Sequence, residues 1–162
     1  MGRITKVVHI VLTAAAWGIF FGSLIRLAVV WDTLPDVIGV HFDGNGEFDL
    51  FDSKMLIAYP YLAALIALVF CDAAALLSKK INTGMKISEN GERKFKTALV
   101  MLLDISKLSF SFFFAGVWAD CIIKQNPLDP NIPTFLMLVL LISFIIFVIS
   151  AIVIKIKNPP EK

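Results

Sequence analysis

The side chains best suited to chemistry gather in one polar, acidic segment, residues 34–54, which separates two long apolar runs. Its histidine, His41, has carboxylates nearby in the sequence, and such a group can act as a general acid or base or bind a metal ion. The candidate metal ligands are His41, Asp36, Asp43 and Asp49. Because acids in a connecting loop need no ligand to be stable in water, we expect these side chains to be solvated rather than to hold a metal.

The alternation of polar residues from Asp43 to Asp49 is similar to that of a calcium-binding loop. An EF-hand requires glycine at position six and glutamate at position twelve, whereas those positions, counted from Asp43, hold Phe48 and Lys54. The sequence also contains no HExxH pair, nucleophile elbow or phosphate-binding loop. We therefore favour a function other than catalysis and leave the cofactor open, and a metal-assisted membrane enzyme using His41 ranks last among the alternatives.

A second group of chemically capable side chains lies within the apolar runs. Asp104 and Lys107 stand three residues apart on one helix face and can neutralise each other, and Asp72 lies at a similar depth in the preceding run. A charge at the centre of a membrane helix costs about 2.5–3.5 kcal/mol, so these groups should face the bundle interior. They can form a proton or ion relay or a structural ion-pair clasp, and we favour the clasp because the pair is self-compensating. The predicted intramembrane polar cluster comprises Arg26, Asp72, Asp104 and Lys107, with Arg26 either facing neighbouring helices or reaching to the outer surface.

The elements that position these residues belong in a membrane. Of the 162 residues, 58% are hydrophobic and 17% charged, whereas soluble domains have about 45–50% apolar and about 25% charged residues. Four apolar stretches reach the roughly 20 residues that cross a bilayer. They are residues 7–31, 53–77, 95–119 and 133–154, with an outer loop at 32–52 and a basic inner loop at 78–96. The first stretch is too long for the apolar region of a cleaved signal peptide, so we predict a single four-helix membrane domain.

The basic residues predict how this domain is oriented. Lysines and arginines gather before the first stretch, in the inner loop and after the fourth stretch, whereas the opposite side has only Lys54 and Lys124. Because cytoplasmic loops carry the excess of positive residues, we predict that both termini are cytoplasmic and that the acidic loop is extracellular. The same rule explains the lysines of the 78–96 loop without nucleic acid as a partner, and this loop should lie against anionic lipid headgroups.

The outer loop is predicted to fold as a cap on the helix ends. Apolar residues alternate with its acids, which makes it too apolar for a purely solvated linker, and Pro35 imposes an extended entry. Short extended pieces are expected around residues 37–42. The predicted fold class is an all-α integral membrane protein with four transmembrane helices and a folded extracellular cap between the first two.

The loop also contains an ordered pattern of residues, Leu34-Pro35-Asp36, Ile38, His41-Phe42, Gly46, Asp49 and Ser53-Lys54, immediately before an apolar stretch. This pattern resembles that of a bacterial membrane-protein family, the SdpI-like proteins, whose shared module is domain of unknown function 1648. The chain differs in having Gly39 where the family commonly has proline, and in having four helices where SdpI-type proteins carry further helices after the module. Carried over by position, the motif residues are Pro35, Asp36, His41, Phe42, Gly46, Asp49, Ser53 and Lys54.

The resemblance implies a protein of the bacterial cytoplasmic membrane. SdpI-type immunity proteins protect a producing cell from its own secreted toxic peptide and signal its presence inside the cell. In such a protein the ligand would be an extracellular peptide, and a cytoplasmic regulator would contact the basic loop at 78–96.

Two functions therefore stand ahead of catalysis. The favoured one is recognition, sensing or immunity, in which the 34–54 loop binds an extracellular peptide or lipid-linked ligand. The alternative is a subunit of a small transporter or channel that uses Asp72, Asp104 and Lys107. Because four helices seldom enclose a path alone, that role requires a homo-oligomer, for which the small-residue face of Gly18 and Gly22 is suited.

Overall fold

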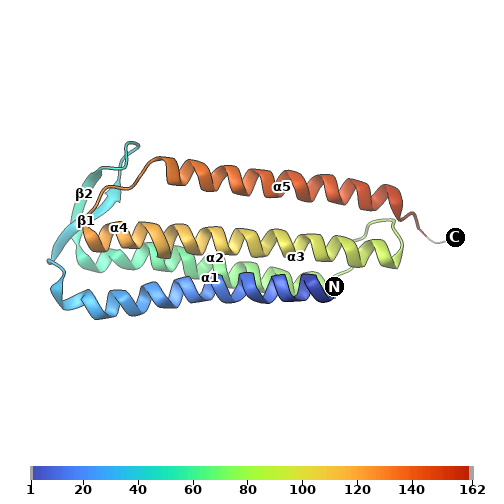
Figure 1. Ribbon diagram of the computed structural model, residues 1–162, viewed down its shortest axis with the longest axis horizontal. Coiled ribbons are helices and arrows are strands. Elements are labelled where there is room, and N and C mark those ends of the chain that lie inside the picture. Colours follow the sequence, from blue (N-terminus) through green and yellow to red (C-terminus); the bar gives the residue numbers. More distant parts are fainter. Residues whose placement is uncertain (1, 161–162) are drawn as a thin grey trace.

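Four long helices lie side by side, and a small two-stranded sheet covers one end of the bundle (Figure 1). The computed structural model describes residues 2–160, with all their side chains except that of Lys79. A short helix, α4 (Ala119–Lys124), continues α3 through a π-helical segment, Phe112–Trp118, so that the third rod runs unbroken from Glu89 to Lys124. The long helices are α1 (Arg3–Val30), α2 (Ala58–Lys80), α3 (Glu89–Ser111) and α5 (Asn131–Lys157).

The third helix organises the bundle because α3 packs against α1, α2 and α5. In Figure 1, α1 and α5 lie on opposite sides of α3. The beginning of α1 and the end of α5 share one end of the molecule, called here the terminal end, and the sheet lies at the other, called the hairpin end.

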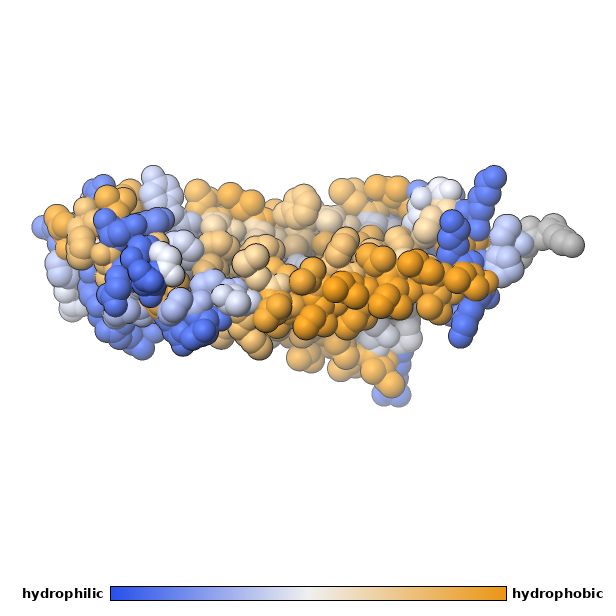
Figure 2. All heavy atoms as spheres, turned by 90° about the horizontal axis from the view of Figure 1, so that it is seen from above, coloured by the Kyte–Doolittle hydropathy of each residue, from blue (hydrophilic) through white to orange (hydrophobic). Residues whose placement is uncertain are grey.

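All four long helices are long and apolar enough to cross a membrane, which confirms the predicted four-span character. At 1.5 Å per residue the 27 residues of α5 extend about 40 Å, more than the roughly 30 Å of a hydrocarbon core. No residue of α5 is buried in the bundle. Apolar surface covers the middle of the molecule and hydrophilic surface covers both ends (Figure 2), as expected of a multi-pass membrane protein.

Several helices extend beyond the predicted membrane spans. Helix α1 begins at Arg3, four residues before the first predicted span, and α5 begins two residues before and ends three residues after the fourth. Within the segment 78–96, predicted as the inner loop, α2 continues to Lys80 and α3 begins at Glu89. Ser88 caps α3 by accepting a hydrogen bond from the backbone N–H of Gly91, and acids in the first turn suit the positive helix N-terminus. A hydropathy argument misses this polar first turn.

The cap between α1 and α2 is a β-hairpin, so the all-α prediction is wrong there. Strand β1 (Val37–Phe42) pairs antiparallel with β2 (Phe48–Ser53), and the register is irregular on both sides of His41. The extended piece expected at 37–42 is confirmed, whereas its partner strand was not predicted. Ile38 and Phe42 are buried on the side facing the helices, and β2 is largely exposed.

The hairpin is tied to the chain segment between α4 and α5. The backbone N–H of Leu128 donates to the carbonyl of Gly46 at 2.8 Å. Gln125, at the end of α4, accepts from the N–H of Gly39 at 2.8 Å and donates to its carbonyl at 3.4 Å. Gly46 has a φ of +85°, and a Cβ placed there would lie 1.7 Å from the carbonyl oxygen of Leu128. Glycine is therefore required at the point where the hairpin turn meets this segment.

Replacing Gly46 with alanine should destabilise the protein by about 1–3 kcal/mol, because the new Cβ meets both an unfavourable φ and a backbone carbonyl. The matched control is Gly44→Ala in the same turn, where a Cβ meets nothing within 4 Å and the φ is not positive. Thermal unfolding of both variants in detergent provides the measurement. Equal melting temperatures for the two variants would contradict this docking of the hairpin.

The hairpin turn should also respond to acid through Asp43. Its carboxylate accepts from the backbone N–H groups of Glu47 and Asn45, which lower the Asp43 pKa below its ordinary value of 3.8. A carboxyl group whose pKa is lowered in the folded state stabilises the protein at pH values above its ordinary pKa. This stabilisation is lost as the pH falls through the lowered pKa. Asp43→Asn should therefore melt below wild type at pH 7, and the two melting temperatures should converge below about pH 3.8. If the difference in melting temperature between wild type and Asp43→Asn did not change with pH, Asp43 would stabilise the turn through its hydrogen bonds and not through its charge.

Candidate functional site

Lys54 joins the two ends of the hairpin segment. Its ammonium lies 3.3 Å from the carboxylate of Asp36, donates to the carbonyl of Leu34 at 3.3 Å and stands 5.4 Å from the ring centroid of Trp31. Its backbone N–H donates to the carbonyl of Asp36 at 2.9 Å. Ser53, the preceding residue, accepts from the N–H of Met55 and begins the turn into α2. These motif residues thus hold the entry and exit of the hairpin together.

His41 and Asp49 form a hydrogen bond across the two strands, with Nδ1 of the histidine 2.6 Å from the carboxylate oxygen. The pair is open to solvent, since 57% of the histidine side chain and 47% of the aspartate side chain are exposed. The other two candidate metal ligands lie elsewhere, because Asp36 pairs with Lys54 and Asp43 closes the turn. Among residues 2–160, no group of three or more histidine, cysteine or acidic side chains is placed to hold a metal ion. Of the four candidate ligands, the structure brings only His41 and Asp49 together.

Between the hairpin and the helices lies a cavity of about 340 Å³, called here the hairpin cavity. Its walls are mostly apolar, and the exposed side chains of Leu50 and Tyr59 stand at its edge. Residues of the hairpin, of the start of α2 and of the π-helical segment contribute to it. The lining residues are Val40, His41, Leu50, Leu56, Tyr59, Pro60, Ala63, Phe114 and Trp118.

The π-helical segment Phe112–Trp118 supplies the aromatic wall of this cavity. A π-helix has wider turns than an α-helix, and such segments occur frequently at functional sites. Phe114 and Trp118 stack with ring centroids 5.7 Å apart, and Trp118 also meets the edge of Phe42 in the hairpin at 5.9 Å. The Nε1–H of Trp118 is buried and has no acceptor among the described residues. Buried donors without a partner are rare in folded proteins.

The predicted cluster of Asp72, Asp104 and Lys107 does form, at the centre of the bundle. The Lys107 ammonium is 1% exposed and lies 2.6 Å from Asp72 and 3.3 Å from Asp104. It also donates to the hydroxyl of Thr13 at 2.8 Å. The ammonium therefore connects α1, α2 and α3, and this group is called here the Lys107 cluster.

The first helix contributes three side chains that sequence reasoning missed. Nδ1 of His9 lies 2.7 Å from Asp104, and Trp17 donates its Nε1–H to Asp72 at 2.9 Å. With Thr13 between them, these residues recur every four positions, which places them on one helix face. That spacing was a readable signal, because histidine, threonine and tryptophan on one face of an apolar helix supply hydrogen bonds to buried charges. They saturate both carboxylates of the Lys107 cluster.

Arg26 does not belong to this cluster and pairs instead with Asp120 near the hairpin end. Asp120 also receives Lys124 at 2.9 Å. Thirteen residues separate Arg26 from Thr13 on one helix, which is about 20 Å along its axis. The prediction that placed Arg26 with the three other charges is therefore corrected by helix geometry.

The small residues of α1 face away from the bundle. Gly18 and Gly22 are exposed, and a Cβ at either position would meet nothing within 4 Å. The contacts within the chain use the other side of the helix, around Ala16 and Phe20. The small-residue face thus stays open toward the surroundings, and a homo-oligomer through it stays a prediction.

Lys107→Met should destabilise the protein by about 3–5 kcal/mol, because it leaves the buried Asp104 and the partly exposed Asp72 without a counter-charge. The matched control is Lys124→Met, which removes a half-exposed ion pair and should cost about 0–1 kcal/mol. Denaturant unfolding in detergent measures both changes. If the two substitutions cost the same, the Lys107 cluster does not hold the helices together.

Comparison with known proteins finds a family model that part of the chain matches. Residues 8–67 match the family model described as "Domain of unknown function (DUF1648)". The match covers most of α1, the whole hairpin and the beginning of α2, which is less than half of the chain. It therefore includes the hairpin motif and the α1 side of the Lys107 cluster, and it ends before Asp72. No curated protein and no solved structure matches the chain.

Proposed function

We propose that this chain is a recognition protein of a bacterial cytoplasmic membrane, which binds an extracellular peptide or lipid-linked ligand in the hairpin cavity. A sensing or immunity role, like that of the SdpI-like proteins, is the form of recognition that the motif in the hairpin favours. The observation that carries the proposal is the apolar cavity between the hairpin and the ends of the membrane helices.

The distribution of charge supports an extracellular hairpin. The basic side chains of α3's first turns and of α5's last turn lie at the terminal end, whereas acids predominate in the hairpin. The excess of lysine and arginine on one side of membrane helices lies in the cytoplasm. With both termini inside, the hairpin cavity faces the medium from which a secreted peptide would arrive.

The hairpin cavity suits an amphipathic ligand. Its volume falls within the roughly 300–1,000 Å³ of small-ligand pockets, which combine apolar walls with a few oriented polar groups. Apolar side chains of a ligand would pack against Phe114 and Trp118. The solvent-exposed pair of His41 and Asp49 would contact the polar part of the ligand.

A transporter subunit is the second candidate, and the Lys107 cluster is the observation behind it. Each charge of the cluster has a counter-charge or a hydrogen-bond partner within the bundle. Such a closed set of partners favours a clasp between helices over a relay that must release its protons or ions. Recognition at the hairpin end therefore stands first.

Filling the hairpin cavity should abolish recognition. Ala63 lines the cavity, so Ala63→Phe places a ring where the ligand would lie, whereas Leu62→Phe adds a ring at the adjacent, exposed position of the same helix. Sensitive bacteria expressing each form would be challenged with a panel of secreted membrane-active peptides. We expect wild type and Leu62→Phe to raise the tolerated concentration of at least one peptide by roughly tenfold, and Ala63→Phe to lose this protection.

Direct binding separates immunity from recognition. The same panel of peptides, fluorescently labelled, would be titrated against wild type and both variants in nanodiscs. Absence of protection with retained, Ala63-dependent binding would remove immunity and keep recognition. If no peptide binds wild type more tightly than Ala63→Phe, recognition of a peptide in this cavity is excluded.

A further inference from the structure

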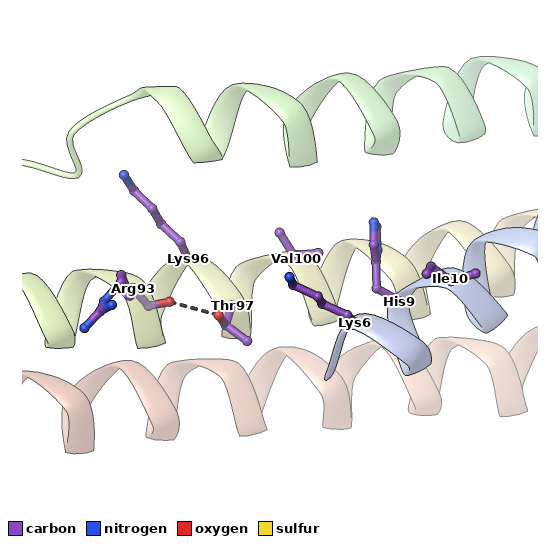
Figure 3. A pocket seen from close by; sticks show the side chains of 7 residues that line it. All are labelled: Lys6, His9, Ile10, Arg93, Lys96, Thr97 and Val100. Atoms are coloured by element: carbon purple, nitrogen blue, oxygen red, sulfur yellow. Dashed lines mark hydrogen bonds between the residues drawn. The ribbon is translucent and has the colours of Figure 1, made fainter. Parts of the chain in front are cut away.

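The terminal end contains a second hollow, of about 480 Å³, between α1 and α3 (Figure 3). We call it the basic pocket. From α1 it is lined by Lys6 and His9, and from α3 by Arg93 and Lys96. It shares no lining residue with the hairpin cavity, and it lies at the opposite end of the bundle.

The charges of the basic pocket are not balanced within the described chain. Lys96 pairs with Glu92 at 2.9 Å, whereas no acidic side chain among residues 2–160 lies within ion-pair distance of Lys6 or Arg93. No acid lines the pocket. Like charges gathered around one hollow raise its positive potential and attract an anion.

Another hollow, of about 430 Å³, adjoins the basic pocket, and the two share Arg93 and Thr97. It adds Lys94 to the basic lining. Arg93 therefore stands between two hollows and can present its guanidinium to either, in the fork geometry that suits a phosphate group. Thr97 lines both hollows, and its hydroxyl donates to the carbonyl of Arg93 at 2.9 Å.

The pocket changes character along its length. Its cationic side chains lie in the first turns of α1 and α3, whereas Ile10 and the buried Val100 line the part nearer the bundle centre. In Figure 1, α1 begins short of the level reached by α3 and α5, which leaves this flank of α3 uncovered. A charged mouth at the headgroup level that continues into an apolar groove matches a phosphate group followed by hydrocarbon.

His9 forms the floor of the charged part and connects it to the Lys107 cluster. The His9 side chain lines the pocket (Figure 3), and its Nδ1 donates to Asp104 at 2.7 Å. An anion in the basic pocket would therefore lie one side chain away from the ion pairs that join the three helices.

We propose that the basic pocket binds the phosphate group of an anionic phospholipid, with Lys6 and Arg93 as its principal charge partners and the apolar groove beside Ile10 holding the start of an acyl chain. This inference does not depend on the proposed recognition at the hairpin end. A soluble phosphate shares the charge chemistry but makes no use of the apolar groove.

Native mass spectrometry of the full chain tests this proposal. Detergent-purified protein would be titrated with phosphatidylglycerol, with phosphatidylcholine and with inorganic phosphate. The pocket variant is Lys6→Gln with Arg93→Gln, and the control is Lys155→Gln with Lys157→Gln, which removes the same charge at the same end from exposed positions of α5. We expect one tightly bound phosphatidylglycerol on wild type and control, and roughly thirtyfold weaker binding to the pocket variant, which is the contribution of two basic contacts.

Three results would overturn the proposal. Equal weakening in both double variants would assign the binding to general surface charge. Equal affinity of wild type for phosphatidylglycerol and phosphatidylcholine would exclude a site for an anionic headgroup. Displacement of phosphatidylglycerol by inorganic phosphate at the same concentration would assign the pocket to a soluble anion. Melting temperatures of the two double variants, measured in parallel, identify any loss of binding that comes from unfolding.

Discussion

A lysine ammonium buried among apolar membrane helices must be neutralised within the bundle, and the arrangement around Lys107 follows from that requirement. Lipid offers no water to solvate the charge, so the helices bring Asp72 and Asp104 within ion-pair distance and add the hydroxyl of Thr13. These partners come from α1, α2 and α3. The register of the three helices is thereby defined at mid-depth by charge, whereas apolar packing between helices in lipid is compatible with several registers. The fourth long helix, α5, packs on α3 without taking part in the cluster.

The two ends of the bundle depend on this register and have opposite chemistry. At the hairpin end, the start of α2 and the π-helical segment stand at the distance that leaves an apolar cavity beneath the hairpin. At the terminal end, α1 and α3 separate to leave the basic pocket. His9 both lines that pocket and forms a hydrogen bond with Asp104. The bundle thus has an apolar cavity at one end and a basic pocket at the other.

Most residues of the hairpin motif hold the shape of the cap rather than line its cavity. Lys54 and Asp36 join the ends of the segment, Gly46 allows the close contact with Leu128, and Phe42 is buried against Trp118. Only His41 among the motif residues also lines the hairpin cavity. The motif residues therefore shape the cap, whereas other residues, such as Leu50 and Tyr59, line the cavity. This is the physical reason that a match to the module names a scaffold and not a ligand.

The sequence by itself determined the membrane character and the number of spans, because hydrophobicity and length act locally and need no knowledge of neighbours. It also indicated the ion pair of Asp104 and Lys107, since residues three apart on a helix are neighbours wherever the helix lies, and it indicated the extended piece at 37–42. Apart from the predicted approach of Asp72 to Lys107, only the tertiary structure decided which residues meet across helices. The pairing of Arg26 with Asp120, the approach of His9 to Asp104 and the docking of Gly46 on Leu128 join positions far apart in the chain. The π-helical segment, the hairpin cavity and the basic pocket likewise result from how the helices pack. No local pattern of residue types contains that information.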